Sequence, residues 1–386
     1  MKYFIIAGEA SGDLHASNLM NELKKADAEA DFCFLGGDLM QAQGGTMVKH
    51  YRQMAFMGIV SVVLNIRTVL RNLRDCKTAI LNYCPDVVIL VDYPSFNLRI
   101  ARFVKEKLTG TPVYYYIAPK IWAWKEGRIK QIKKYIDQMF TILPFETEYF
   151  AGHNYQVEYV GNPTVDSVVK FTPIHATLAD FCTHNHLAQK PIIAVLAGSR
   201  KQEIRQCLAR MVEAAACFPD YQVVVAGAPG VELDFYHSVL PNVDFQIVFG
   251  QTFELLHHSR VAIVTSGTAT LETAMFNTPE VVVYQVPFGK FGYWVKERII
   301  KVKYISLVNL VAEKEVVKEL IAHQFTVDRI KGELPRMLFD DDFRHQMLDE
   351  YATVRQRLGE SGAAACAAEK IVSYLRNSPM KSEKVK

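Results

Sequence analysis

Residues 2–24 read KYFIIAGEASGDLHASNLMNELK, a short apolar run followed at once by a glycine-containing turn and a helix-like stretch. This order is typical of the first βα unit of a nucleotide-binding domain. The glycines lack the spacing of a dinucleotide fingerprint, and no Gly-Lys-Ser/Thr follows as it would in a P-loop. The turn also contains two acids, Glu9 and Asp13, which would repel a phosphate. The stretch therefore predicts a βα unit whose turn holds something other than a phosphate.

The composition is that of an ordinary globular protein of two domains. The chain has 386 residues, 50% hydrophobic and 22% charged, and its net charge of +3 is too small to argue for nucleic acid. The seven cysteines are scattered without a Cys-x-x-Cys pair, which indicates reduced thiols in a cytosolic protein. There is no signal-peptide pattern and no run of the ~20 apolar residues that span a bilayer. We therefore expect a protein that is soluble or lies on a membrane surface.

Apolar runs alternate with amphipathic stretches through most of the chain, which indicates an α/β fold with parallel sheets. A polar, poorly periodic stretch from Asp166 to Lys190 separates two such series. We expect two doubly wound Rossmann-like domains, 1–165 and 166–340, and a helical segment 341–386 that packs back on the first domain. The expected strands are Tyr3–Ala7, Asp31–Leu35, Val87–Val91, Val113–Ile117, Gln138–Leu143, Val157–Val160, Ile192–Leu196, Gln222–Ala226, Phe245–Val248, Val261–Val264 and Val281–Tyr284.

Two strand ends in the second half have the features of a nucleoside diphosphate site. Gly198-Ser199-Arg200 precedes a helix, so free amides and one guanidinium are available for a diphosphate. Ser266-Gly267-Thr268 has the same position after another strand, and Glu272 lies one helical turn later, where it could accept from ribose hydroxyls. The alternative for each turn is an ordinary helix start, and the occurrence of two such strand ends in one domain favours the functional interpretation of Ser266-Gly267-Thr268. Asn309, in an apolar context, is either a turn former or a ligand-binding amide.

The strand ends in the first half are acidic. Asp92 follows the apolar run VVILV, where a carboxylate can take a proton from a substrate hydroxyl or cap the next helix. Glu9, Ser11 and Asp13 suit the hydroxyls of a sugar, and the glycines between them allow a close approach to the backbone. Because ligands bind beyond the carboxyl ends of parallel strands, we expect a cleft with a sugar wall and a nucleotide wall.

Residues 57–74 combine apolar side chains around most of a helix with Arg67, Arg71 and Arg74 on one stripe. This pattern suits a helix in a membrane interface, and it equally suits a core helix with a basic solvent face. A second basic cluster surrounds Trp122 and Trp124, which are either interfacial anchors or core residues. The side chains that would enter lipid or contact acyl chains are Val60, Val63, Leu64 and Leu70.

Together these motifs resemble those of lipid-A-disaccharide synthases, which are inverting glycosyltransferases of the GT-B fold. The resemblance covers nearly the whole chain, and the order and spacing of the motifs make it specific. Three positions depart from the family pattern: Asn162 replaces a usual histidine, and Ala197 and Val308 replace usual prolines. The motifs are GEASGD (8–13), MGI (57–59), DYPSFN (92–97), APKIWAWKEGRI (118–129), LPFE (143–146), AGSRKQEI (197–204), SGTATLE (266–272) and YISLVNL (304–310).

The resemblance implies that UDP-2,3-diacylglucosamine donates its sugar to 2,3-diacylglucosamine 1-phosphate, giving a tetraacyl β(1→6) disaccharide 1-phosphate and UDP. Asp92 would deprotonate the acceptor hydroxyl, and Arg200 with the helix start at Ser266–Thr268 would stabilise the departing UDP. Glu272 would hold the ribose. The residues that would orient sugars or phosphate are Glu9, Ser11 and Asn309.

The resemblance also implies a setting for this chemistry. Enzymes of this fold generally need no metal. Neither an Asp-x-Asp site nor a histidine cluster is evident in the sequence. His184-Asn185-His186 and His257-His258 are interpreted as surface pairs. The protein is expected in the cytoplasm, bound peripherally to anionic lipids on the cytoplasmic face of the inner membrane. The oligomeric state stays open.

Two other classes of function fit parts of this pattern. UDP-sugar epimerases share the nucleotide wall but have no acyl-binding helix. A non-catalytic UDP-sugar or lipid-binding module would not need Asp92, Arg200 and Glu272 together. The 57–74 stretch is the feature that distinguishes an acylated acceptor from a soluble sugar.

Overall fold

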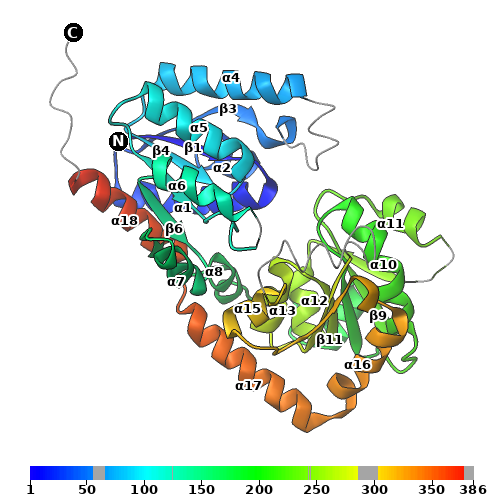
Figure 1. Ribbon diagram of the computed structural model, residues 1–386. Helices are drawn as coiled ribbons and strands as arrows, with labels where there is room; N and C mark the ends of the chain where they lie inside the picture. The colour runs from blue at the N-terminus through cyan, green and yellow to red at the C-terminus, as the bar shows by residue number, and fades with distance from the viewer. Residues whose placement is uncertain (55–65, 124, 242, 244, 286–302, 378–386) are drawn as a thin grey trace. The chain divides into compact units, whose positions relative to one another are not determined.

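The computed structural model describes residues 1–54, 66–123, 125–241, 243, 245–285 and 303–377 (Figure 1). The chain forms two compact units. One comprises Met1–Pro163 together with the C-terminal part from Ser361, and the other comprises Thr164–Glu360. The predicted boundary at 165/166 lies close to the observed one, whereas the segment 341–386 is divided between the two units.

The first unit is built on a sheet of seven parallel strands in the order β3-β2-β1-β4-β5-β6-β7. β1 and β4, at its centre, are apolar and almost wholly buried, as expected for parallel strands covered on both faces. The strand order reverses between β1 and β4, which places a topological switch point there. The strands are β1 (Lys2–Ala7), β2 (Asp31–Gly36), β3 (Thr46–His50), β4 (Val87–Val91), β5 (Val113–Tyr116), β6 (Gln138–Thr141) and β7 (Glu158–Tyr159).

Helices cover both faces of this sheet (Figure 1). One face packs against α4 (Ile66–Tyr83), α5 (Pro94–Lys107) and α6 (Ile129–Tyr135). The other face packs against α1 (Ala10–Ala26) and α18 (Ala363–Asn377), which also contact each other. The C-terminal helix therefore completes the hydrophobic core of the unit that the N-terminus begins. The shorter helices are α2 (Asp38–Ala42) and α7 (Phe145–Gly152).

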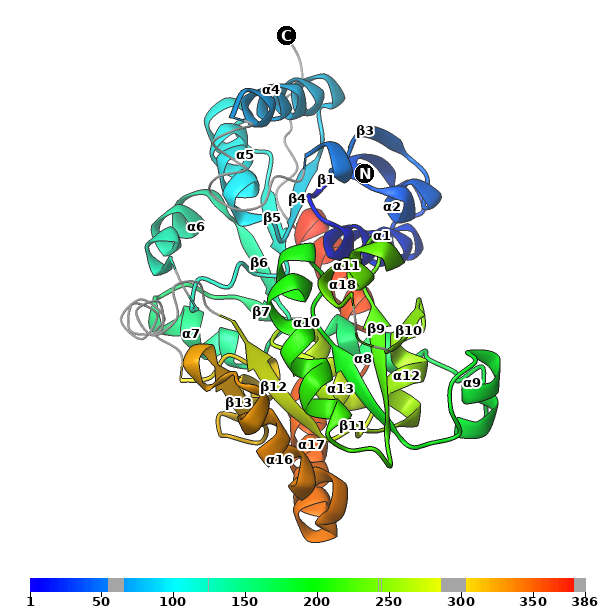
Figure 2. The same ribbon diagram turned by 90° about the vertical axis from the view of Figure 1, so that its right-hand side faces the viewer.

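The second unit repeats the architecture with six parallel strands in the order β10-β9-β8-β11-β12-β13, and its switch point lies between β8 and β11. α10 and α16 pack together on one face of this sheet (Figure 2), while α9, α12 and α13 cover the other. The strands are β8 (Ile192–Leu196), β9 (Gln222–Gly227), β10 (Gln246–Phe249), β11 (Ser259–Thr265), β12 (Glu280–Tyr284) and β13 (Lys318–Ile321). The helices are α8 (Pro163–Val169), α9 (Leu178–His184), α10 (Lys201–Ala216), α11 (Leu233–Val239), α12 (Thr252–His258), α13 (Thr268–Met275), α15 (Leu307–Ala312), α16 (Val327–Phe339) and α17 (Asp341–Leu358).

The predicted α/β class with two Rossmann-like sheets is confirmed, and each predicted strand is present with small shifts at its ends. Two strands were missing from the prediction, β3 and β13. Both lie at the edge of a sheet and contain only two apolar residues each, in TMVKH and KELI. An edge strand has only one neighbour and needs fewer buried side chains, so its apolar signal is weak. Among the described helices, none has the length and apolarity to cross a bilayer.

Candidate active site and nucleotide site

The acidic strand ends of the first unit meet at its switch point. Ala7 of β1 pairs with Val91 of β4, so Gly8-Glu9 and Asp92 leave the sheet from neighbouring strands. Gly8 is needed at this point, because a Cβ atom there would lie 2.3 Å from the ring of Tyr93. The Tyr93 hydroxyl donates a hydrogen bond to the carbonyl of Met54 at 3.2 Å. The turn between β1 and α1 therefore packs directly against the turn after β4.

Asp92 stands on a constrained turn. Both Asp92 (φ 43°) and Tyr93 (φ 48°) have left-handed backbones, a conformation that costs non-glycine residues about 1–3 kcal/mol. The Asp92 carbonyl accepts hydrogen bonds from Asn97 Nδ2 at 2.6 Å and from the Tyr115 hydroxyl at 2.5 Å. Asn97 is fully buried and donates also to the Val91 carbonyl at 3.2 Å. These buried donors hold the turn in its strained form.

Several charged side chains lie near the turn after β4. Burial, together with the negative charge of Asp92, raises the pKa of the Tyr115 phenol well above its ordinary value. Burial and the charge of Glu9 likewise raise the pKa of Tyr93. Arg128 donates to Ser95 Oγ at 2.8 Å, and burial lowers the pKa of its guanidinium. The switch point therefore holds two carboxylates with a cation near the start of α5.

Asp13 has a different role from the one the sequence suggests. Its buried carboxylate accepts hydrogen bonds from the backbone N–H groups of Gly37 at 2.7 Å, Leu39 at 3.1 Å and Met40 at 3.1 Å. It thereby fixes the start of α2, where backbone N–H groups have no partners within the helix. Asp13 therefore has a structural role in positioning α2. Ser11 is exposed in the first turn of α1.

The second unit brings its two glycine turns together at its own switch point. Leu196 of β8 pairs with Val264 of β11, so the turns that begin at Ala197 and Ser266 are neighbours. Gly198 has φ +103°, and a Cβ atom there would also lie 2.5 Å from a Glu203 oxygen. Glu203 accepts from the Ser199 N–H at 3.1 Å and pairs with Arg200 Nη1 at 3.2 Å. A carboxylate thus stands at the helix start that the sequence assigns to a diphosphate.

The turn after β11 is anchored on one side and open on the other. Ser266 donates from its backbone N–H to the Val283 carbonyl at 2.9 Å and from its hydroxyl to the Ile305 carbonyl at 2.8 Å. Gly267 follows in an extended conformation, and Thr268 is exposed at the start of α13. The Ser266 hydroxyl therefore holds a neighbouring loop, while Thr268 remains accessible to a ligand.

Glu272 is the most unusual carboxylate in this turn region. It is half-buried in α13, and desolvation raises its pKa to about 7. Within the described part of the chain its carboxylate makes no hydrogen bond and no ion pair. A desolvated acid without donors carries an energetic cost that a ligand with hydroxyl donors would relieve. Glu272 lies one turn into α13, the helix that follows the Ser266–Thr268 turn.

Asn309, which the resemblance places among the residues that orient sugar or phosphate, is hydrogen-bonded within the protein. It is fully buried, and its side-chain oxygen accepts from Val316 N–H at 2.7 Å and Val317 N–H at 2.9 Å. Its amide nitrogen donates to the Val317 carbonyl at 2.8 Å and to Glu319 Oε1 at 2.9 Å. An asparagine amide has two donors and two acceptor positions, and all four are occupied. Asn309 therefore fixes the loop between α15 and β13.

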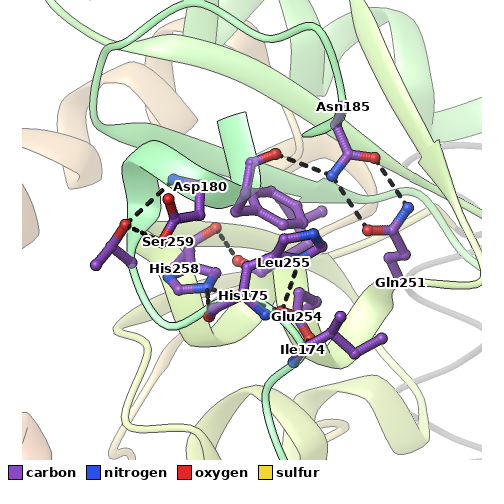
Figure 3. A network of polar contacts seen from close by, with 11 residues as sticks. Ile174, His175, Asp180, Asn185, Gln251, Glu254, Leu255, His258 and Ser259 are labelled. Carbon is purple, nitrogen blue, oxygen red and sulfur yellow. Dashed lines mark hydrogen bonds and ion pairs between the residues drawn. The ribbon is translucent and has the colours of Figure 1, made fainter. Parts of the chain in front are cut away.

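His258, which the sequence suggests to belong to a surface pair, takes part in a buried network with His175 and Glu254 (Figure 3). Glu254 of α12 accepts from His175 N–H at 2.7 Å, from the His175 ring at 3.0 Å and from Ile174 N–H at 3.2 Å. The side chain of His258 is only 6% exposed, stacks on Phe181 and contacts the His175 carbonyl at 3.1 Å. The network fastens the segment after α8 to α12. The described residues contain no group of three or more side chains that could hold a metal ion.

Trp122 belongs to the core of the first unit. It is 7% exposed, and its indole donates to the buried Glu146 carboxylate at 3.0 Å, which links two of the quoted motifs. Arg67, Leu70, Arg71 and Arg74 are exposed on α4, opposite its buried face. The residues singled out by the sequence that lie outside the described part of the chain are Val60, Val63, Leu64 and Trp124.

Comparisons with known proteins agree with the architecture. The family described as lipid-A-disaccharide synthetase matches residues 3–371. The lipid-A-disaccharide synthase of Myxococcus xanthus (strain DK1622) is 39% identical over 381 residues, which is 97% of each chain. Among solved structures, the UDP-GlcNAc 2-epimerase of Neisseria meningitidis bound to UDP-GlcNAc has a TM-score of 0.66 at 13% identity, covering 98% of this chain and 100% of that one. The calicheamicin glycosyltransferase CalG4 has a TM-score of 0.57 at 16% identity, covering 98% of each chain. These two structural similarities show the GT-B fold alone.

Proposed function

The chain belongs to the lipid-A-disaccharide synthase family. From this premise we propose that it transfers 2,3-diacylglucosamine from the donor UDP-2,3-diacylglucosamine to the acceptor 2,3-diacylglucosamine 1-phosphate. It is a glycosyltransferase of lipid A biosynthesis. The proposed products are a tetraacyl β(1→6) disaccharide 1-phosphate and UDP. The reaction is one displacement at the donor C1, with inversion at that carbon.

Asp92 is the general base of this proposal. It takes the proton of the acceptor 6-hydroxyl as the hydroxyl oxygen attacks C1 and the bond from C1 to the diphosphate breaks. The observation that carries the assignment is the position of Asp92 at the β1–β4 switch point, on a strained turn that Asn97 and Tyr115 hold. Glu9, on the neighbouring strand end, and exposed Ser11 orient the sugar hydroxyls.

The second unit binds the UDP group. Glu272 accepts hydrogen bonds from the ribose hydroxyls, a role that its desolvation and lack of partners support. Gly267 and Thr268 offer backbone N–H groups to the diphosphate, and Ser199 adds its own by exchanging its hydrogen bond to Glu203. Arg200 exchanges its ion pair with Glu203 for the departing phosphate, and because Arg200 is 53% exposed, losing that ion pair costs little. The carbonyl-bonded hydroxyl of Ser266 holds the turn in place.

The site of action is the cytoplasmic face of the inner membrane, where both acylated substrates reside. Exposed Arg67, Arg71 and Arg74 with exposed Leu70 support a contact of α4 with anionic lipid. The same proposal includes Val60, Val63 and Leu64 as lipid-contacting residues.

Mass spectrometry of the products from the two diacylglucosamine substrates tests the reaction. A tetraacyl disaccharide 1-phosphate should form with UDP and should be nearly absent with Asp92→Asn. An epimerase would instead return an altered UDP-sugar without a new glycosidic bond. A binding module would leave both substrates unchanged. Either result would overturn the proposed transfer.

A further inference from the structure

A pocket between α5 and α6 lies outside the residues assigned to the transfer. It has a volume of about 380 Å³ and opens on the outer side of the helix layer that covers one face of the first sheet. Its apolar part is formed by Leu98 and Tyr135. The remaining lining residues are Arg99, Arg102, Lys130, Gln131 and Lys134, so the pocket is lined by four cations and no acid.

The charge of this pocket is poorly compensated within the protein. Arg102 pairs with Glu106 at 2.7 Å. Lys134 lies over the ring of Tyr135, with 5.4 Å between its ammonium and the ring centroid. Within the described part of the chain, Arg99 and Lys130 make no ion pair. Like charges that converge on a concave surface repel each other and raise the local concentration of anions, so the pocket favours an anionic ligand.

We propose that this pocket binds the phosphate group of an anionic lipid headgroup. Arginine offers a planar fork of N–H donors to phosphate oxygens, and lysine adds point charge, so Arg99 and Arg102 with the two lysines suit a phosphate. The apolar wall at Leu98 and Tyr135 suits the glycerol part of the headgroup.

A lipid is the source of the phosphate because of the neighbouring helix. α4 packs against α5 in the same layer, with Lys77 over the ring of Phe103 at 5.0 Å. α4 exposes Leu70 and Leu81, at 55% and 44%, next to its arginines. Exposed apolar side chains on the helix that packs against α5 fit a ligand that carries acyl chains. This inference rests on the membrane contact in the proposed function and assigns it a headgroup site.

Two matched variants of the full chain test the pocket. Lys130→Gln/Lys134→Gln removes two charges from the pocket, and Lys107→Gln/Lys133→Gln removes two from the same helices outside its lining. All four side chains are exposed, and comparable melting temperatures would verify that both variants fold. Binding is measured by flotation with phosphatidylcholine vesicles that contain or lack phosphatidylglycerol.

We expect the pocket variant to bind the phosphatidylglycerol vesicles roughly tenfold more weakly than the native chain, while the control variant loses only about twofold. Equal losses in the two variants would overturn the proposal, because they would show a diffuse basic surface. The proposal would also be overturned if the pocket variant bound the phosphatidylglycerol vesicles as tightly as the native chain.

A second experiment uses soluble glycerol phosphate as a competitor for the pocket. If millimolar glycerol phosphate abolishes the difference between the two variants and protects the native chain from heat without vesicles, the pocket takes a free phosphate and the lipid assignment is wrong. Calorimetry with UDP separates this test from the proposed reaction, since UDP affinity should be the same in both variants. Loss of UDP binding in the native chain would count against the transferase assignment and leave the vesicle comparison intact.

Discussion

The polar residues of the two turn regions differ in how many of their hydrogen-bonding positions are occupied by partners within the protein. The Asp13 carboxylate accepts from three backbone N–H groups, and the Asn309 amide has all four of its hydrogen-bonding positions occupied within the protein. Glu272, in contrast, is desolvated and has no partner among the described residues. A buried polar group normally finds a partner, so an unsatisfied one beside a switch point indicates where a ligand binds.

Asp92→Asn tests the general base. The amide keeps the size of the side chain but cannot accept the acceptor's proton, so turnover should fall roughly 10²–10⁴-fold. UDP affinity, measured by calorimetry, should stay within a factor of about two, because Asp92 lies in the other unit. A near-normal rate would show that Asp92 only stabilises its turn.

Glu272 makes UDP binding dependent on pH. Its pKa of about 7 lies above the ordinary 4.5, so the unliganded protein favours the protonated acid and loses stability as the pH rises from 4.5 to 7. Ribose hydroxyls that donate to the carboxylate favour its ionised form and lower that pKa. UDP binding near pH 7 should therefore release a fraction of a proton from this residue.

Calorimetry in buffers of different ionisation enthalpy measures this proton release. Glu272→Gln serves as the control, because UDP itself titrates in this range and its contribution is common to both proteins. The glutamine variant should release less and should bind UDP more weakly by about 1.5–3 kcal/mol. Identical proton release by the two proteins would remove Glu272 from the ribose site.

Elements are positioned by buried polar contacts that join distant parts of the chain. The Asn309 amide spans α15 and β13, Glu254 fastens the segment after α8 to α12, and Trp122 joins α7 through Glu146. Such contacts fix loops that hydrophobic packing alone would leave variable.

The substitution Asn309→Ala tests whether Asn309 stabilises the loop between α15 and β13 or binds a ligand. It leaves two backbone N–H groups, a carbonyl and Glu319 without their partner, so the free energy of unfolding should fall by about 2–4 kcal/mol. Urea titration measures this loss. UDP affinity at low temperature, where the variant is folded, should be nearly native. A stable variant with weak UDP binding would restore the ligand-binding role.

At the scale of the whole molecule, the two ends of the chain belong to one folding unit. α18 packs on α1, and Ala367, Ile371 and Val372 are buried in the core that includes β1. The Tyr374 hydroxyl and Lys370 also bond to Glu158 of β7, at 2.7 and 2.8 Å. The first unit is therefore completed only after the second has been synthesised.

Removal of residues 361–386 should expose the apolar side of α1 and destabilise the first unit. We expect a loss of several kcal/mol, since burying each aliphatic side chain contributes about 1.5–3 kcal/mol. Proteolysis followed by mass spectrometry should show cleavage within 1–163 while 164–360 stays protected. Equal protection of both units would show that α18 is dispensable.

The sequence by itself determined the α/β class, the central strands and the turns that follow them. These features depend on local patterns, namely fully apolar runs such as VVILV and glycine turns ahead of helices. Tertiary structure alone decided which polar residues in those turns are already occupied. Asp13 finds its partners 24 to 27 residues away, and the Ser266 hydroxyl finds its partner 39 residues away. Hydrogen-bond satisfaction is a property of three-dimensional neighbours, so Asp13, Asn309 and Glu272 look alike as motif residues and differ in the fold.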